Sequence, residues 1–348
     1  MGVPMMSVGD RGGDRCRSRM NAGAVMVMAL ACAALFTLAS CSPGKDPSTG
    51  GDGLKSWGYI MTGTIDPLKD KIYLADAVSR YDALCLTGYY LNGRGDLVTS
   101  EPSATLCTRL RGARSLYPLV TFSSVAEGKS FLGSFAAWES AVQRIVSLVE
   151  SAPFSGVHFD FEYLPAEFAP RLGEFLALAG ERIRAVGPKT LSMAIFPPEE
   201  FPVKWSSFHD LSKIGRHLDE IVLMCYDMNR PDTAPGPVTS ARWTERNIAR
   251  VIKSFPASRT WLGIPAYGYL WPPSGRATVI SARDGVREST LRSGARDQSG
   301  NLTYSFATPS GRYIAYVSDA QMRRTLTVLA RDKGLKGIAL WRLGMEDE

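Results

Sequence analysis

The chain has 348 residues, of which 45% are hydrophobic, and this is enough for one large domain of the size that an α/β barrel needs. Its formal net charge is +6, from 40 basic and 34 acidic side chains. No basic run is interleaved with aromatic residues, so the charge gives no case for a nucleic-acid-binding protein.

Residues 1–40 have the pattern of a secretory signal peptide. Arginines precede an uncharged apolar run that ends in Leu38-Ala39-Ser40-Cys41. Cysteine directly after Leu-Ala-Ser resembles a bacterial lipobox, so we expect Cys41 to become the lipid-modified first residue of a lipoprotein. An uncleaved membrane anchor is the alternative. Either one predicts a protein tethered in the cell envelope, on the periplasmic side or at the cell surface. Residues 41–56, rich in Gly, Pro and Ser, are predicted to form a flexible tether.

From residue 57 to residue 348, apolar strand-like runs alternate with segments of helical period. The eight runs are residues 57–62, 83–91, 116–122, 156–163, 190–196, 220–227, 260–267 and 337–343. Helical spacing is clearest in 138–149 and 168–183, and capping-box spacing in 318–321 predicts another helix start. Eight strands alternating with helices predict a parallel (β/α)8 TIM barrel. A doubly wound open sheet is the alternative, but no Gly-rich phosphate turn follows the first run.

Two departures from a regular barrel are expected. Residues 272–317, between the seventh and eighth runs, are polar with strand-like pieces at 302–307 and 313–317, and we interpret them as a small β-rich insertion on the barrel rim. The printed sequence leaves no residues for an eighth helix after the eighth run. Another segment must therefore cover that side, and the one after Ser42 is a candidate.

The cysteines of this region are Cys85, Cys107 and Cys225. An odd number without Cys-x-x-Cys spacing argues against a metal site or a disulfide framework. We expect no cofactor. A Cys85–Cys107 bridge and buried free thiols both remain open.

The fourth run carries the most informative pattern. In residues 155–163, apolar side chains alternate with His158, Asp160 and Glu162. Side chains in a strand repeat every two residues, so the two carboxyl groups are predicted to point the same way, on the face opposite the covering helices. A half-buried edge strand with its polar side in water is the alternative.

Other polar and aromatic residues are predicted to join these carboxyl groups, because barrel enzymes place catalytic groups at the C-terminal ends of the strands. The candidates from four of the runs are Asp160, Glu162, Met224, Tyr226, Asp227, Tyr267 and Trp341. Aromatic faces stack on sugar rings, and carboxyl groups handle protons at a glycosidic oxygen. The set is typical of a carbohydrate site.

Four motifs resemble those of glycoside hydrolase family 18, the chitinases and their relatives. They are Ser155 to Glu162 (against Asp-Gly-x-Asp-x-Asp-x-Glu), Met-x-Tyr-Asp at 224–227, Gly-Ile-Pro-x-Tyr-Gly at 263–268, and Trp-Arg-Leu-Gly at 341–344. The last looks most like the spore-germination and cortex-lytic N-acetylglucosaminidase branch. The resemblance covers about residue 57 to the C-terminus.

This resemblance implies a retaining mechanism in which the substrate's own 2-acetamido carbonyl attacks the anomeric carbon. Glu162 would act first as acid and then as base, with its pKa raised by the adjacent Asp160. Asp160 would orient the acetamido N–H and stabilise the developing positive charge. Tyr226 would hydrogen-bond the acetamido oxygen, Asp227 would help position that group, and Trp341 would form the floor beneath the cleaved sugar.

Two candidates for substrate binding are less specific. Tyr267 either forms a wall of the cleft or fills the upper layer of the barrel. Met224 is expected in the core rather than in contact with substrate.

The fourth-strand motif departs from the family pattern at Ser155 and His158, which replace two carboxylates. A cationic His158 would pair with Asp160 below its ordinary pKa of about 6.5 and shift the pH–rate profile. The alternative is a structural imidazole packed under the site. The related cortex-lytic branch carries Asn at this position, so activity need not be lost.

The sequence therefore predicts a monomeric, lipid-anchored glycosidase that cleaves β-1,4-linked N-acetylglucosamine-containing glycans, peptidoglycan or chitin-type. A non-catalytic, lectin-like barrel of the same family is the alternative. Lectin-like members usually lack the glutamate at the position of Glu162, which favours the enzyme.

Overall fold

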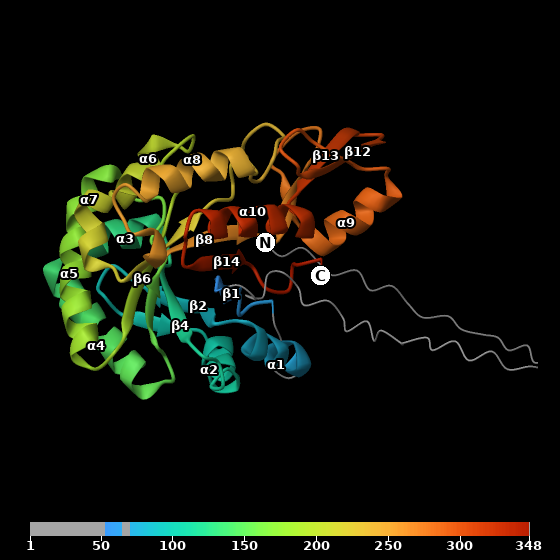
Figure 1. Cartoon of the computed structure of the whole chain (residues 1–348). Helices are drawn as coiled ribbons and strands as arrows, with labels where there is room; N and C mark the ends of the chain where they lie inside the picture. The colour runs from blue at the N-terminus through green and yellow to red at the C-terminus, as the bar shows by residue number, and fades with distance from the viewer. Residues whose placement is uncertain (1–52, 65–69, 348) are drawn as a thin grey trace, which may run out of the picture. The chain divides into compact units, whose positions relative to one another are not determined.

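The computed structural model describes residues 53–64 and 70–347 (Figure 1). The predicted signal peptide, the lipid site at Cys41 and nearly all of the tether lie outside the described residues. Among the helices of these described ranges, none combines the length and the hydrophobicity that a membrane span requires.

A closed barrel of eight parallel strands forms the body of the protein (Figure 1). The strands are β1 (Lys55–Ile60), β2 (Ala83–Leu91), β4 (Leu116–Phe122), β5 (Gly156–Phe159), β6 (Thr190–Ile195), β7 (Glu220–Met224), β8 (Thr260–Pro265) and β14 (Gly337–Trp341). Parallel pairing of β1 with both β2 and β14 closes the sheet. The predicted TIM barrel is confirmed, and the open-sheet alternative is wrong. A short strand, β3 (Leu97–Thr99), lies beside β2 and pairs with it in antiparallel orientation.

Helices pack around the barrel in the connections between its strands. They are α1 (Lys71–Arg80), α2 (Glu101–Arg109), α3 (Val125–Leu132), α4 (Phe135–Ser151), α5 (Ala169–Ala185), α6 (Val203–Ser206), α7 (Leu211–Ile214), α8 (Ala241–Val251) and α10 (Ala320–Asp332). Helices α4 and α5 coincide with the two clearest helical patterns of the sequence. In the described chain, residues 342–347 after β14 contain no helix. Hydrogen bonds join this segment to α1 through Tyr73 and Glu346 and to Arg283 through Met345.

Apolar and polar residues alternate along the strand β5 because its two faces have different surroundings. Phe159 and the following Phe161 pack outward against Phe175 of α5, with ring centroids 5.4 and 6.1 Å apart. His158 points into the barrel interior, where its ring lies 5.1 Å from that of Trp57. Because β5 pairs with β4 on one side and β6 on the other, the edge-strand alternative is wrong.

The insertion between β8 and β14 is a five-stranded antiparallel sheet in the order β10-β9-β13-β12-β11. Its elements are β9 (Tyr267–Trp271), β10 (Thr278–Ser281), α9 (Ala282–Leu291), β11 (Ala295–Arg296), β12 (Leu302–Thr308) and β13 (Gly311–Val317). Tyr267 therefore belongs to the insertion sheet. The prediction from the sequence that it lies in the seventh barrel strand is wrong. Gly268 lets β9 approach β13, because a Cβ there would lie 2.1 Å from the Tyr316 carbonyl oxygen. Helix α9 was not predicted.

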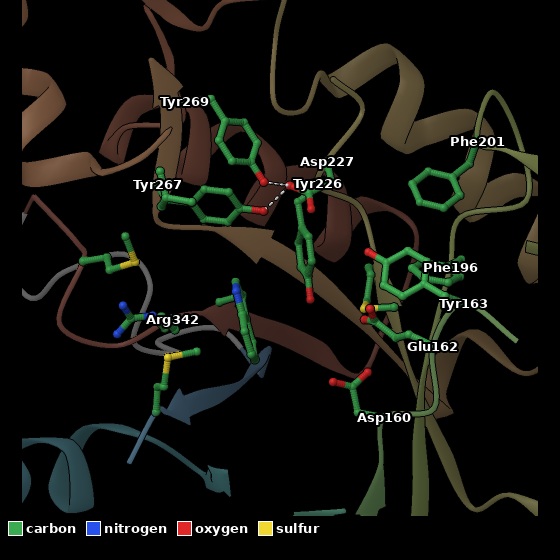
Figure 2. A pocket seen from close by; sticks show the side chains of 15 residues that line it. Asp160, Glu162, Tyr163, Phe196, Phe201, Tyr226, Asp227, Tyr267, Tyr269 and Arg342 are labelled. Carbon is green, nitrogen blue, oxygen red and sulfur yellow. Dashed lines mark hydrogen bonds between the residues drawn. The ribbon is translucent and has the colours of Figure 1, made fainter. Parts of the chain in front are cut away.

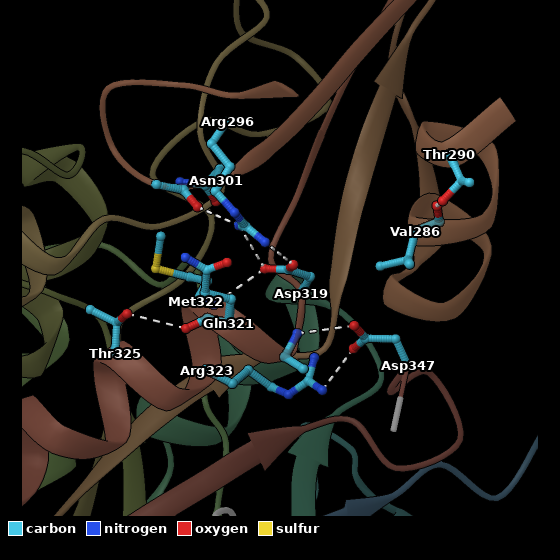
Figure 3. A network of polar contacts seen from close by, with 12 residues as sticks. Val286, Thr290, Arg296, Asn301, Asp319, Gln321, Met322, Arg323, Thr325 and Asp347 are labelled. Atoms are coloured by element: carbon cyan, nitrogen blue, oxygen red, sulfur yellow. Dashed lines mark hydrogen bonds and ion pairs between the residues drawn. The ribbon is translucent and has the colours of Figure 1, made fainter. Parts of the chain in front are cut away.

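Two ion pairs fasten the insertion and the C-terminal segment to α10 (Figure 3). Arg296 of β11 pairs with Asp319, and Arg323 pairs with Asp347 at 2.7 Å. Asp319 is also the N-cap of α10, accepting a hydrogen bond from the Met322 amide at 3.2 Å. The helix thus begins one residue later than a Ser318 cap would place it.

The three cysteines Cys85, Cys107 and Cys225 are buried free thiols. A Cys85–Cys107 disulfide bridge is therefore absent from the structure, and that alternative of the sequence analysis is wrong.

Candidate active site

A pocket of about 390 Å³ opens at the C-terminal ends of the barrel strands (Figure 2). The seven residues proposed from the sequence for catalysis and substrate binding all line it: Asp160, Glu162, Met224, Tyr226, Asp227, Tyr267 and Trp341. Only His158, the proposed modulator, does not. The volume lies within the range of small-molecule sites and is suited to a sugar.

Asp160 and Glu162 lie just beyond β5 rather than within it, since the strand ends at Phe159. The backbone of Asp160 is still held by strand β4: its amide donates to the Val120 carbonyl at 3.0 Å, and its carbonyl accepts from the Thr121 hydroxyl at 2.6 Å. The chain then turns at Tyr163, whose φ is 61°. The extended path up to this turn places both carboxyl groups in the pocket.

Burial and mutual contact set the protonation of this pair. Burial raises the pKa of Asp160 to about 6, and a hydrogen bond with Glu162 opposes that rise. Burial also raises the pKa of Glu162 well above its ordinary value, and both the charge of Asp160 and the shared hydrogen bond raise it further. The two effects favour the protonated form of Glu162 over that of Asp160. Two neighbouring carboxyl groups whose pKa values differ in this way indicate an acid and its charged partner.

His158 does not pair with Asp160, contrary to one sequence-based expectation. Its Nε2 is hydrogen-bonded to the Tyr59 hydroxyl and its Nδ1 to the Ser192 hydroxyl, each at 2.9 Å. Burial lowers the pKa of His158 to about 3. The imidazole is therefore neutral at physiological pH and structural, and its partner Tyr59 contacts the pocket residue Trp341 edge-on, with ring centroids 5.2 Å apart.

This burial predicts a specific acid sensitivity. Because the pKa of His158 falls from 6.5 in the unfolded chain to about 3 in the folded one, the unfolded state binds the extra proton first as pH falls below 6.5, and stability is lost. Replacing His158 with Gln removes this contribution. We expect the loss of unfolding free energy between pH 7 and pH 4.5 to shrink by about 2–3 kcal/mol. Denaturant titrations at both pH values measure it, and an unchanged loss would contradict a buried neutral histidine.

Asp227 is fixed by two tyrosines of the insertion. Its Oδ1 accepts hydrogen bonds from the Tyr267 hydroxyl and, at 2.7 Å, from the Tyr269 hydroxyl (Figure 2). Its backbone φ is 60°, which turns the chain directly after Tyr226. Burial raises the pKa of Asp227, and the two tyrosine hydroxyls counteract this. Tyr269 was not predicted as a site residue, although its spacing of two from Tyr267 places both on one face of a strand.

Aromatic and apolar side chains complete the pocket. Tyr163, Phe196 and Phe201 line one wall, and the Tyr163 and Phe196 rings lie 5.2 Å apart. Trp341 ends β14 and also lines the pocket, and its peptide bond to Arg342 is cis. None of Tyr163, Phe196, Phe201 and Arg342 was named as a site residue from the sequence.

Across residues 53–64 and 70–347, no group of three or more His, Cys, Asp and Glu side chains is arranged to hold a metal ion. The carboxyl and hydroxyl groups that line the pocket can transfer protons and form hydrogen bonds with a ligand.

A parallel barrel with paired carboxyl groups and aromatic walls at the strand C-termini defines the class of barrel glycoside hydrolases. The model of glycosyl hydrolases family 18 matches residues 121–346. The chain belongs to this family.

Individual relatives agree with this assignment. The chain is 23% identical over 212 residues to the uncharacterized glycosylase YvbX of Bacillus subtilis, covering 59% of this chain and 62% of YvbX. The crystal structure of the spore cortex-lytic enzyme SleL of Bacillus cereus matches with a TM-score of 0.75 and 18% identity, over 84% of this chain and 71% of that one. A chitinase of Chromobacterium violaceum matches with a TM-score of 0.76 and 21% identity, over 85% and 96%. The two structures share the fold with this chain.

Proposed function

We propose that this protein hydrolyses β-1,4-linked N-acetylglucosamine-containing glycans by a substrate-assisted retaining mechanism. One observation carries the proposal: the carboxyl groups of Glu162 and Asp160 line one pocket with aromatic walls, and burial beside Asp160 raises the pKa of Glu162. Family membership supports glycosidase activity in general, and the acetamido requirement comes from the way this family is expected to act.

In the proposed reaction, Glu162 donates its proton to the glycosidic oxygen as the bond to the anomeric carbon breaks. The carbonyl oxygen of the substrate's 2-acetamido group attacks that carbon and forms an oxazolinium intermediate. The Glu162 carboxylate then takes a proton from water, which opens the intermediate and restores the starting configuration. The raised pKa of Glu162 favours the protonated form that this step needs.

Three neighbours are assigned to the acetamido group. Asp160 accepts a hydrogen bond from the acetamido N–H and stabilises the positive charge of the intermediate. The Oδ1 atom of Asp160 is buried without a hydrogen-bond partner in the described structure. Tyr226 donates to the acetamido oxygen. Asp227, held by Tyr267 and Tyr269, positions this end of the site. Trp341 is the surface on which the cleaved sugar stacks.

We place the protein in the cell envelope, lipid-anchored through Cys41, and propose peptidoglycan as the first candidate substrate. An envelope lipoprotein lies beside this polymer, and the similarity to SleL agrees with that choice. Chitin-type glycan is the second candidate, in line with the similarity to a chitinase. We propose that the protein acts as a monomer.

Measuring turnover distinguishes the proposed hydrolase from a lectin-like barrel, which would bind the glycan without cleaving it. The purified protein is expected to release a chromogenic aglycone from an N-acetylglucosamine oligosaccharide and to bind the same ligand. Digests of purified sacculi and of chitin oligomers, with products identified by mass, then distinguish the two polymers. Binding without release from any of these substrates would favour the lectin.

A further inference from the structure

Arg342 is the only cation among the described residues that line the pocket. The other charged lining residues are the carboxyl groups of Asp160, Glu162 and Asp227, and all three take part in the proposed reaction. Arg342 does not. Met61 and Met345 line the same pocket. A half-buried guanidinium needs a compensating partner, and the reaction as proposed supplies none.

Among the described residues, few groups contact this guanidinium. One nitrogen, Nη1, donates a hydrogen bond of 2.7 Å to the Thr64 hydroxyl. The charge of Glu346 favours the protonated form of Arg342, and the Glu346 carboxylate accepts a hydrogen bond from the Tyr73 hydroxyl at 3.2 Å. Arginine presents five N–H donors in a planar fork that matches a carboxylate. In the described part of the chain, one hydrogen bond, to Thr64, uses this donor capacity, and the remaining donors can serve a ligand.

Arg342 and the proton donor lie on opposite sides of the pocket. Figure 2 shows Arg342 across from Glu162 and Tyr163. In a 1,4-linked pyranose, C1 and C4 are at opposite ends of the ring. When C1 of the cleaved sugar faces Glu162, its C4 faces away from Glu162, on the side of Arg342. The next sugar toward the non-reducing end of the glycan is joined there.

We propose that Arg342 binds a carboxylate carried by the sugar on the non-reducing side of the cleaved N-acetylglucosamine. This inference rests on the proposed function and narrows its substrate to glycans in which neutral N-acetylglucosamine alternates with a sugar bearing a carboxyalkyl ether. The guanidinium pairs with the carboxylate, and Met61 and Met345 contact the alkyl part of the ether. A uniformly neutral polymer offers Arg342 no such partner.

Binding measurements on the full-length Glu162→Gln protein test this without turnover. Calorimetry compares the neutral N-acetylglucosamine tetramer with an alternating tetramer that bears free 3-O-lactyl carboxylates. We expect the acidic tetramer to bind more tightly. Adding Arg342→Gln weakens that binding by roughly ten- to a hundredfold and leaves neutral binding within about threefold. Arg342→Lys recovers part of the affinity, because it keeps the charge and loses the fork. Arg171→Gln, on the exposed face of α5, is the matched control.

Salt provides a second measurement that needs no substitution at Arg342. Raising the salt concentration should weaken binding of the acidic tetramer and leave the neutral one unaffected. No preference for the acidic tetramer, or equal losses for both tetramers in Arg342→Gln with no salt effect, would overturn the inference. Hydrolysis of the neutral oligomer by the wild-type protein is scored separately. Cleavage without an acidic preference removes only the carboxylate site, whereas an Arg342-dependent preference without cleavage removes only the proposed function.

Discussion

Glu162→Gln is expected to lower kcat on an N-acetylglucosamine oligosaccharide by about 10²–10⁴-fold, the usual contribution of a general acid–base. Glutamine keeps the shape of the side chain and cannot donate a proton to the leaving oxygen. Steady-state kinetics with a poor leaving group measure the loss. Because binding does not depend on the proton, KM should change far less than kcat.

The leaving group provides the control for this variant. A substrate whose aglycone needs no protonation should recover much of the first step in Glu162→Gln. The matched variant Glu174→Gln changes an exposed carboxylate on α5 and is expected to keep wild-type rates. Equal losses with good and poor leaving groups would contradict the role of Glu162 as acid.

Asp160→Asn is expected to lower kcat by about 10²–10³-fold, comparable with the loss of one group that stabilises a developing charge. The same substitution should also move the pH profile. The charge of Asp160 raises the pKa of Glu162, so removing it lowers that pKa. The protonated acid is then lost at lower pH, and the alkaline limb of kcat/KM shifts downward.

A pH–rate series on the wild-type and Asp160→Asn proteins measures both effects. Asp76→Asn, on the exposed side of α1, provides the matched control. A reduced rate with an unmoved alkaline limb would show that the two carboxyl groups do not interact as the structure indicates.

The barrel could be predicted from the sequence because its signal is local. Each of the eight strands carries its own apolar run, and the helices on either side of β5 have clear 3.6-residue periods. The ends of the strands are harder to predict from the sequence than the strands themselves. The alternating pattern of β5 continues to Glu162, but the paired strand ends at Phe159. Alternation persists in an extended chain beyond the last ladder hydrogen bond, so it does not mark the end of a strand.

The same distinction between local and long-range signals applies to the residues of the site. Residues in motifs at strand ends, such as Asp160 and Tyr226, were found because the barrel brings those ends together. The environment of His158 was not, because its partners Tyr59 and Ser192 are 99 and 34 residues away in the chain. Arg342 and Phe201 reach the pocket through loop conformations that have no period in the sequence.

The assignment of Tyr267 illustrates a third case. The apolar stretch that contains it continues from β8 into β9 across Pro265 and Ala266, without a polar segment between the barrel strand and the insertion. Only the pairing of β9 with β13 shows where the barrel ends. The residue lies in the pocket as expected, on a different sheet.

The configuration of the first product tests the central claim most directly. Proton NMR spectra taken during the first minutes of hydrolysis of an N-acetylglucosamine oligomer distinguish the two anomers before they equilibrate. Participation of the 2-acetamido group with Glu162 as acid and base predicts the β-anomer first, and no cleavage of an otherwise identical glucose oligomer. The α-anomer appearing first, or equal rates on the glucose oligomer, would contradict it.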